Sequence, residues 1–348
     1  MVTDLPPRPN TAPPSSAPHP EQSQELTAIF EDEAFTQDDF EDDGVSQGGD
    51  AQMEEPRAAW VRPNNREYVP RYLGGYQDCA FLRYARTQKE HTYLYGPPGT
   101  GKGALVEAAF FPDAQVITDE DAEYSRSHNG IYTIIGEEET AVADFVGTYV
   151  QDPHSGLFQW VHGPLTLAVL DDVPLFVDEI LLIDPKVLSS VLYPLMDGRN
   201  ILHIPSNPTL PPIPVGPGFC VIGAGNPDVV GAKFSEALRD RFDHHIEIRT
   251  DWELAKSLGV PAWIVRVARE LDEERARGTI TWSPQMRSLE AFRNHERRYG
   301  TAYAVAALVG KAPEEDRVHI VSRLKLCPEV KASKVKALRL GGKRPGTL

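Results

Sequence analysis

Residues 96–104 combine glycines with one lysine in a spacing suited to binding a phosphate chain. The segment reads Gly-Pro-Pro-Gly-Thr-Gly-Lys-Gly-Ala, so that Lys102 directly follows the glycine at 101. Glycines let successive backbone N–H groups turn toward one anion, and the N-terminus of a following helix adds partial positive charge. The Lys102 ammonium supplies a point charge for the outer phosphates. This spacing is typical of the phosphate-binding loop of nucleoside triphosphatases.

Two carboxylates, Asp178 and Glu179, end an apolar run that is expected to form a strand. The carboxyl ends of parallel strands meet at one edge of a sheet, so a neighbouring strand would bring both acids beside the phosphates. Asp178 would then hold Mg²⁺, mostly through water, and Glu179 would polarise the attacking water. Asn226 ends the next apolar run and could hold that water by hydrogen bonds. Its alternative role is that of a turn former before Pro227.

Position 103 departs from the usual pattern, in which a Ser or Thr hydroxyl follows the lysine and ligates magnesium. Gly103 has no side chain, and Ala104 after it has no hydroxyl either. One interpretation is a live site that holds magnesium with one fewer protein ligand. The other is a nucleotide-dependent assembly scaffold with little hydrolysis. We favour the live site, because Asp178, Glu179 and Asn226 are all in place.

Two arginines lie in the short polar segment 235–242. Arg239 or Arg241 could reach the γ-phosphate bound by a neighbouring subunit and act there as an arginine finger. The alternative is an exposed helix held by salt bridges.

The elements that must position these groups follow from the apolar periodicity. Strands are expected at 91–95, 116–117, 132–135, 175–177, 219–224 and 246–248. The polar span between the second and third of these is expected to be a surface loop, and residues 157–164 a small hairpin. Strands that alternate with helices predict a parallel sheet with helices on both faces, whereas only helices are expected from Asp251 onward.

The charge of the chain is unevenly distributed along its 348 residues. The formal net charge is −16, and residues 1–56 hold 14 acidic side chains against one basic one. We therefore expect a disordered acidic, Pro-rich tail over 1–58, an α/β nucleotide-binding domain over 59–250, a helical domain over 251–325 and a basic tail over 326–348. In the acidic tail, Phe30, Phe35 and Phe40 recur every five residues. The tail is then either a solvated segment or a docking motif for a partner.

The composition also limits the compartment and the partners. Three widely spaced cysteines form neither a disulfide framework nor a zinc site, which fits a reducing cytoplasm. The N-terminus has no signal-peptide pattern, and no apolar run reaches about 18 residues, so we expect no membrane span. Net negative charge makes a nucleic-acid partner unexpected. Only the basic residues near 331–344 support the alternative of a nucleic-acid-translocating NTPase.

Several segments in a fixed order resemble the MoxR-type branch of AAA+ ATPases, close to CbbQ/NorQ-like and CobS-like proteins. The resemblance covers roughly residues 66–325. The segments are Gly96–Lys102, Asp144–Tyr149, Gly163–Ala168, Leu175–Ile180, Pro194–Arg199, Gly225–Pro227 and Ser235–Phe242.

This resemblance implies an ATPase that forms a ring, usually a hexamer, with ATP and Mg²⁺ bound between subunits. By position, Lys102 resembles the Walker A lysine, and Asp178 with Glu179 the Walker B pair. Asn226 resembles sensor 1, and Arg241 the arginine finger with Arg239 as runner-up. Arg287 resembles the sensor 2 arginine of a helical lid. The residues implied to contact the nucleotide are Gly96, Pro97, Pro98, Gly99, Thr100, Gly101, Lys102, Gly103, Ala104 and Arg287.

The resemblance also implies partners. The segment Leu157–His162 resembles an insert that faces the ring pore and a protein client. Proteins of this kind often work with a partner that carries a von Willebrand factor A domain, and they remodel a client or help to insert a metal.

Overall fold

The computed structural model describes residues 60–118, 125–229, 231–232, 234–330 and 335–338. The expected acidic tail over 1–58, with Phe30, Phe35 and Phe40, lies outside the described residues. Most of the basic stretch near 331–344 does so too.

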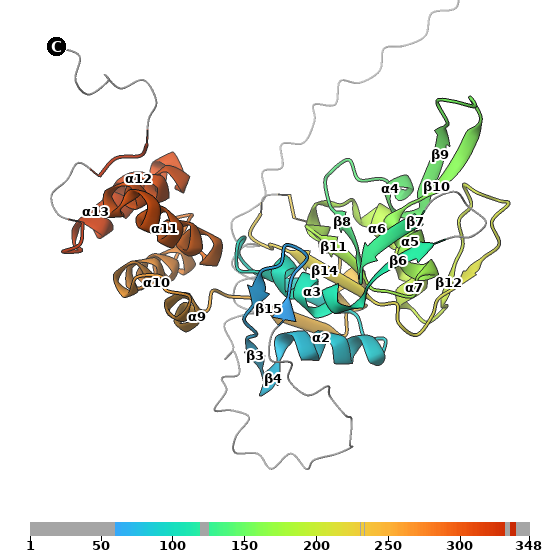
Figure 1. Cartoon of the computed structure of the whole chain (residues 1–348), viewed down its shortest axis with the longest axis horizontal. Coiled ribbons are helices and arrows are strands. Elements are labelled where there is room, and N and C mark those ends of the chain that lie inside the picture. Colours follow the sequence, from blue (N-terminus) through green and yellow to red (C-terminus); the bar gives the residue numbers. More distant parts are fainter. Residues whose placement is uncertain (1–59, 119–124, 230, 233, 331–334, 339–348) are drawn as a thin grey trace, which may run out of the picture. The chain divides into compact units, whose positions relative to one another are not determined.

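A five-stranded parallel sheet forms the centre of the α/β part (Figure 1). The strands in chain order are β5 (Thr92–Tyr95), β8 (Tyr132–Ile135), β11 (Leu175–Asp178), β14 (Val221–Gly225) and β15 (His244–Glu247). Their order across the sheet is β15-β5-β14-β11-β8, and every neighbouring pair is parallel. The strand that carries Asp178, β11, was expected beside the phosphate-loop strand β5. It lies one strand further away, because β14 is placed between β5 and β11.

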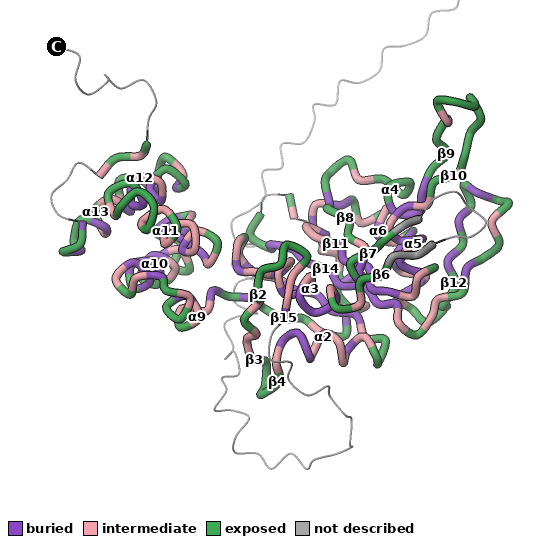
Figure 2. The backbone as a smooth tube through the Cα atoms, viewed as in Figure 1, coloured by how far each residue is buried: buried purple, intermediate pink, exposed green. Residues whose placement is uncertain are grey.

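Helices cover both faces of this sheet, as the sequence predicted. On one face, α2 (Asp78–Thr87) and α3 (Lys102–Phe110) share an apolar cluster with Leu94, Phe176 and Ile222. On the other, side chains at alternate strand positions, such as Tyr93 and Val177, lie in a second cluster. The helices that contribute to this second cluster are α4 (Val142–Val146), α5 (Pro164–Leu170), α6 (Pro185–Val191), α7 (Tyr193–Met196) and α8 (Glu236–Arg239). Figure 2 shows the buried residues concentrated in the strands and the inner sides of the helices.

Two-stranded antiparallel hairpins surround the sheet. They are β1–β2 (Trp60–Val61, Glu67–Tyr68), β3–β4 (Tyr72–Leu73, Tyr76–Gln77), β6–β7 (Ala114–Thr118, Ser125–Asn129), β9–β10 (Gly147–Gln151, Phe158–His162) and β12–β13 (Ile201–Leu202, Ile213–Pro214).

Two sequence expectations differ from the structure. The strand expected at 116–117 is present within β6, but it pairs with β7 and does not belong to the central sheet. Strand β7 itself lies in the span that was expected to be a surface loop. The polar sequence Ser-Arg-Ser-His-Asn of β7 has no apolar alternation that could have shown this strand. The hairpin expected within residues 157–164 is larger than predicted. Its second strand, β10, lies in that range, but its first strand, β9, begins at Gly147.

The C-terminal part of the described chain is entirely helical. Its helices are α9 (Trp252–Ser257), α10 (Ala262–Ala276), α11 (Met286–Tyr299), α12 (Thr301–Lys311) and α13 (Glu314–Lys325). They enclose an apolar cluster of their own, built around Ile264, Leu289 and Leu308. The first of these helices, α9, is short and is capped by the Asp251 side chain, which accepts from Leu254 N at 2.8 Å. Among the described helices, none combines the length and apolarity needed to cross a membrane.

Candidate functional site

The loop between β5 and α3 has the backbone that its glycines predict. Gly96 has φ +131°, and a Cβ atom there would lie 2.5 Å from the carbonyl oxygen of Ile248. Gly101 has φ +98° and is the N-cap of α3. Both conformations favour glycine, and together they deliver the chain directly into a helix N-terminus. The free N–H groups of that terminus suit an anion.

Lys102 lies inside this loop with only 7% of its surface exposed. Its Nζ donates to the carbonyl oxygens of Gly96 at 2.7 Å and Pro97 at 3.1 Å. Burial lowers the pKa of its ammonium, and the negative charges of Glu179 and Asp178 act in the opposite direction. Lys102 and the two carboxylates are therefore close enough to influence one another electrostatically.

The two carboxylates stand where β11 ends. Asp178 Oδ1 accepts from the backbone N–H of Glu179 at 3.1 Å, and Glu179 has a left-handed backbone with φ +51°. Burial raises the pKa of both carboxyls; the charge of Asp178 raises that of Glu179 further, and Lys102 acts against both shifts. A positive φ at a residue that is not glycine is a strained conformation that often occurs at functional sites.

The carboxylates at the end of β11 are the donors that this site offers to a magnesium ion. Within the described ranges, no group of three or more His, Cys, Asp or Glu side chains gathers to hold a metal. Asp178 with Glu179 nevertheless fits Mg²⁺, which is commonly bound through one or two carboxylates, waters and the phosphates of a nucleotide. A Cβ atom at Gly103 would meet only the ring of Phe176, at 3.8 Å, so the structure leaves room for a side chain there.

Asn226 follows β14, the strand between β5 and β11. Its side chain is buried, and its Oδ1 accepts from the backbone N–H of Asp228 at 3.2 Å. The turn-forming contact that the sequence left open is thus present. Because Oδ1 serves that contact, the amide NH₂ group is the part of Asn226 that could donate to a phosphate or to a water.

Arg239 and Arg241, the two candidates for an arginine finger, contact aromatic side chains of their own chain. The guanidinium of Arg241 stacks over the ring of Tyr193 at 3.9 Å and donates to the carbonyl oxygen of Ala237 at 2.6 Å. The Arg239 guanidinium lies 5.5 Å from the ring centre of Phe234. Neither arginine is among the described residues that line the cavity of its own chain.

A cavity of about 740 Å³ lies over the phosphate loop. Loop residues 98–104 line it together with Asp178, Glu179, the N-terminal segment 66–69 and residues of α9 and α11. Its size is in the range of pockets that take small-molecule ligands. The side chains in its wall from α9, its C-cap and α11 are Leu254, Leu258, Met286, Arg287, Glu290, Arg293 and Asn294.

Arg287 stands at the start of α11, at the phosphate loop. Its backbone N–H donates to the carbonyl oxygen of Gly99 at 3.1 Å, and its side chain lines the cavity. The charge of Arg287 lowers the pKa of both Lys102 and Asp178. The structure therefore brings Arg287 together with the phosphate loop and the carboxylates.

Sequence reasoning missed Arg71, which also lines the cavity. Its guanidinium donates to the carbonyl oxygen of Thr100 at 3.1 Å and to Tyr68 Oη at 3.0 Å. It also forms an ion pair of 3.4 Å with Asp78, whose carboxylate also accepts from the Tyr68 hydroxyl at 2.6 Å. No motif marks an arginine in an irregular segment, so the sequence carried no signal for this brace.

Comparison with known proteins agrees with this geometry. Residues 91–242 match the family model described as the AAA domain of the dynein-related subfamily. The fold is that of an AAA+ domain. The five-stranded sheet, the phosphate loop and both carboxylates belong to this AAA+ domain, and a helical region follows it.

Among solved structures, a chain described as "a putative ATPase from Cytophaga hutchinsonii" is similar at 16% identity with a TM-score of 0.36. The similarity covers 69% of this chain and 78% of that chain. The comparison with curated proteins gave no match.

Proposed function

We propose that this protein is an ATP-hydrolysing remodelling ATPase of MoxR type that acts on a protein client as an oligomeric ring. The observation that carries the proposal is the convergence of Lys102, Asp178, Glu179 and Arg287 on the cavity over the phosphate loop. Two cations and two carboxylates suit a magnesium–triphosphate complex.

Each group has a defined task in this proposal. Lys102 Nζ exchanges its two carbonyl partners for phosphate oxygens, and the backbone N–H groups at the start of α3 bind the same phosphates. Asp178 holds Mg²⁺, which neutralises charge on the outer phosphates when it is bound. Glu179 accepts the proton of the attacking water. The Asn226 amide orients that water, and Arg287 binds the phosphates from α11.

A ring is proposed because the arginine-finger candidates lie outside the cavity of their own chain. Arg241 of the partner subunit, with Arg239 as the second choice, would then stabilise the charge that develops during phosphoryl transfer. A hexamer in the cytoplasm and a partner with a von Willebrand factor A domain are proposed on the family resemblance.

The β9–β10 hairpin supports a protein client. Its strands and connecting turn carry exposed apolar side chains, with Leu157 and Phe158 each 67% exposed. Exposed apolar groups are typical of surfaces that contact another protein. We assign the client contact to this hairpin.

A second candidate is an assembly scaffold that binds ATP but scarcely hydrolyses it. Gly103 favours it, since this position supplies no hydroxyl to magnesium.

The deciding experiment is a phosphate-release assay paired with negative-stain microscopy with and without ATP. We expect steady turnover and rings for the wild type, and for Glu179→Gln we expect nucleotide binding without turnover. Glu253→Gln, an exposed carboxylate paired with Lys256 on α9, is the matched control and should hydrolyse normally. Absent turnover in a wild-type ring would favour the scaffold. Wild-type turnover in Glu179→Gln would overturn the role given to Glu179.

A further inference from the structure

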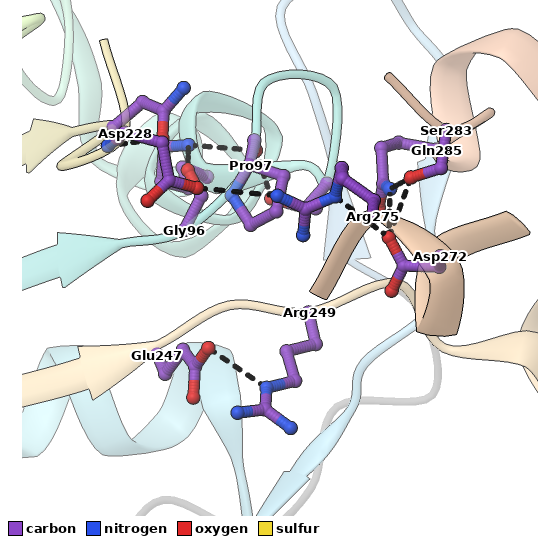
Figure 3. Close-up of polar contacts among 12 residues, drawn as sticks. Gly96, Pro97, Asp228, Glu247, Arg249, Asp272, Arg275, Ser283 and Gln285 are labelled. Carbon is purple, nitrogen blue, oxygen red and sulfur yellow. Dashed lines mark hydrogen bonds and ion pairs between the residues drawn. The ribbon is translucent and has the colours of Figure 1, made fainter. Parts of the chain in front are cut away.

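An ion pair joins the helical region to the loop that follows β14 (Figure 3). Arg275 lies in the last turn of α10, and its Nη1 atom is 3.2 Å from Asp228 Oδ2. Its Nε lies 3.2 Å from Asp272 Oδ1 on its own helix. One guanidinium is therefore held by two carboxylates, one from the helical region and one from the AAA+ sheet loop.

Asp228 is also the residue that fixes the Asn226 side chain. Its backbone N–H donates to Asn226 Oδ1 at 3.2 Å, while its carboxylate faces Arg275. A displacement of Asp228 toward or away from Arg275 would therefore change the position of the Asn226 amide.

On the helical side, Asp272 connects Arg275 to the start of α11. Asp272 Oδ1 accepts from Ser283 Oγ at 2.6 Å and from Gln285 Nε2 at 2.8 Å. Gln285 directly precedes α11, and its Oε1 accepts from Thr250 Oγ1 at 2.6 Å. Ser283, Gln285 and Thr250 are all buried. Buried polar groups that satisfy one another form a rigid connection.

The connection continues to the nucleotide loop. Two residues after Gln285, the backbone N–H of Arg287 donates to the carbonyl oxygen of Gly99. A continuous set of polar contacts thus leads from Asn226 through Asp228, Arg275 and Asp272 to the segment that holds Arg287 against the phosphate loop.

We propose that Arg275 is a positioning residue that couples Asn226 to the helical region through Asp228. The inference rests on the proposed function, since it requires ATP in the cavity with its γ-phosphate in reach of the Asn226 amide. ADP lacks that phosphate, so only ATP can use the coupling. A residue can favour one nucleotide over another only through an interaction that differs between the two. The contact of Asn226 with the γ-phosphate is such an interaction, and so the ion pair contributes to the preference for ATP over ADP.

The test compares ATP and ADP binding in four variants. Asp228→Asn removes the charge and keeps the backbone contact to Asn226, while Arg275→Gln removes the other partner. The variant with both substitutions completes a double-mutant cycle, which measures the interaction between Asp228 and Arg275. Arg269→Gln is the control, because Arg269 lies on the same helix and forms an ion pair of 3.6 Å with Glu273 of that helix. Dissociation constants are measured with fluorescent analogues of both nucleotides in the presence of magnesium.

We expect the preference for ATP over ADP to fall about threefold to fivefold in each single variant, the size typical of a partly exposed ion pair. The ADP constant should stay unchanged, and the double variant should be no worse than either single one. The control should resemble the wild type.

Three results would overturn the inference. One is an equal loss of ATP and ADP affinity, which would mean that the pair only stabilises the helical region. The others are an unchanged preference and additive effects in the double variant. A wild-type protein that binds neither nucleotide would instead overturn the proposed function, and this inference with it. Asp228 is 65% exposed at its side chain, so its variant is expected to fold.

Discussion

The backbone N–H of Arg287 donates a hydrogen bond of 3.1 Å to the carbonyl oxygen of Gly99, in the middle of the phosphate loop. The contact is made by the main chain and does not depend on the arginine side chain. A Cβ atom at Gly99 would lie 3.3 Å from Arg287 Cβ, so the two backbones approach closely. The position of α11 at the loop can therefore be separated experimentally from the charge that Arg287 carries.

Replacing Arg287 by Gln should weaken ATP binding without disturbing the fold, because the hydrogen bond to Gly99 is kept. We expect the ATP dissociation constant to rise about tenfold, as for the loss of one charged hydrogen bond at an accessible site. The measurement is titration with a fluorescent ATP analogue. Arg298→Gln, at the exposed end of the same helix, is the matched control. Equal effects of the two substitutions would contradict a phosphate contact for Arg287.

Hydrolysis should depend on pH through Glu179. A protonated carboxyl cannot accept a proton from water, so turnover falls as the pH drops through the pKa of Glu179. Burial and the charge of Asp178 raise that pKa above the ordinary value of about 4.3. The acid limb of kcat should therefore lie at higher pH than for an exposed glutamate. Circular dichroism over the same range controls for unfolding, and turnover that stays constant down to pH ~4.5 would refute the assignment.

Gly103→Ser should lower the magnesium concentration needed for turnover, since a hydroxyl would add a ligand and the site has room for it. Gly103→Ala is the matched control. It fills the same space without a ligand and should stabilise α3 by roughly 0.5–1 kcal/mol, because alanine favours helices over glycine. Magnesium titrations of phosphate release distinguish the two. If serine and alanine behaved alike, the missing hydroxyl would have no importance for this site.

Gly96→Ala should destabilise the protein strongly. It combines a backbone that disfavours side chains with a Cβ atom 2.5 Å from the Ile248 carbonyl oxygen, and we expect a loss of about 2–5 kcal/mol in the free energy of unfolding. Gly198→Ala is the comparison, because Gly198 has φ +83° but nothing within 4 Å of the new methyl group. Urea unfolding measures both. Similar losses for the two variants would show that the close approach to Ile248 has no effect.

Arg241→Ala should abolish turnover while leaving ATP binding intact, if Arg241 acts on the site of a neighbouring subunit. Arg239→Ala tests the second choice. Mixing Arg241→Ala with Glu179→Gln subunits should restore some turnover, because one type of interface then holds an intact Glu179 and an intact Arg241. Full activity of Arg241→Ala by itself would exclude it as the finger.

The sequence by itself determined the central elements and their type. The glycine spacing predicted the phosphate loop, and buried apolar runs predicted the strand that ends at Asp178 and the strand that precedes Asn226. The prediction of a parallel sheet covered on both faces is confirmed. These features are local, because side-chain periodicity and glycine conformations depend on residues that are close in sequence. The roles of the individual site residues remain predictions.

Only the tertiary structure decided which distant segments meet. It inserted β14 between β5 and β11, paired β6 with the polar strand β7, and brought Arg71 to Thr100 and Arg275 to Asp228. Contacts of this kind join residues far apart in the sequence, 47 positions for Arg275 and Asp228 and 130 positions for Val221 and His91, and their energies come from packing and ion pairing between whole elements. No local pattern encodes them, and so the sequence predicted the phosphate loop but not the braces around it.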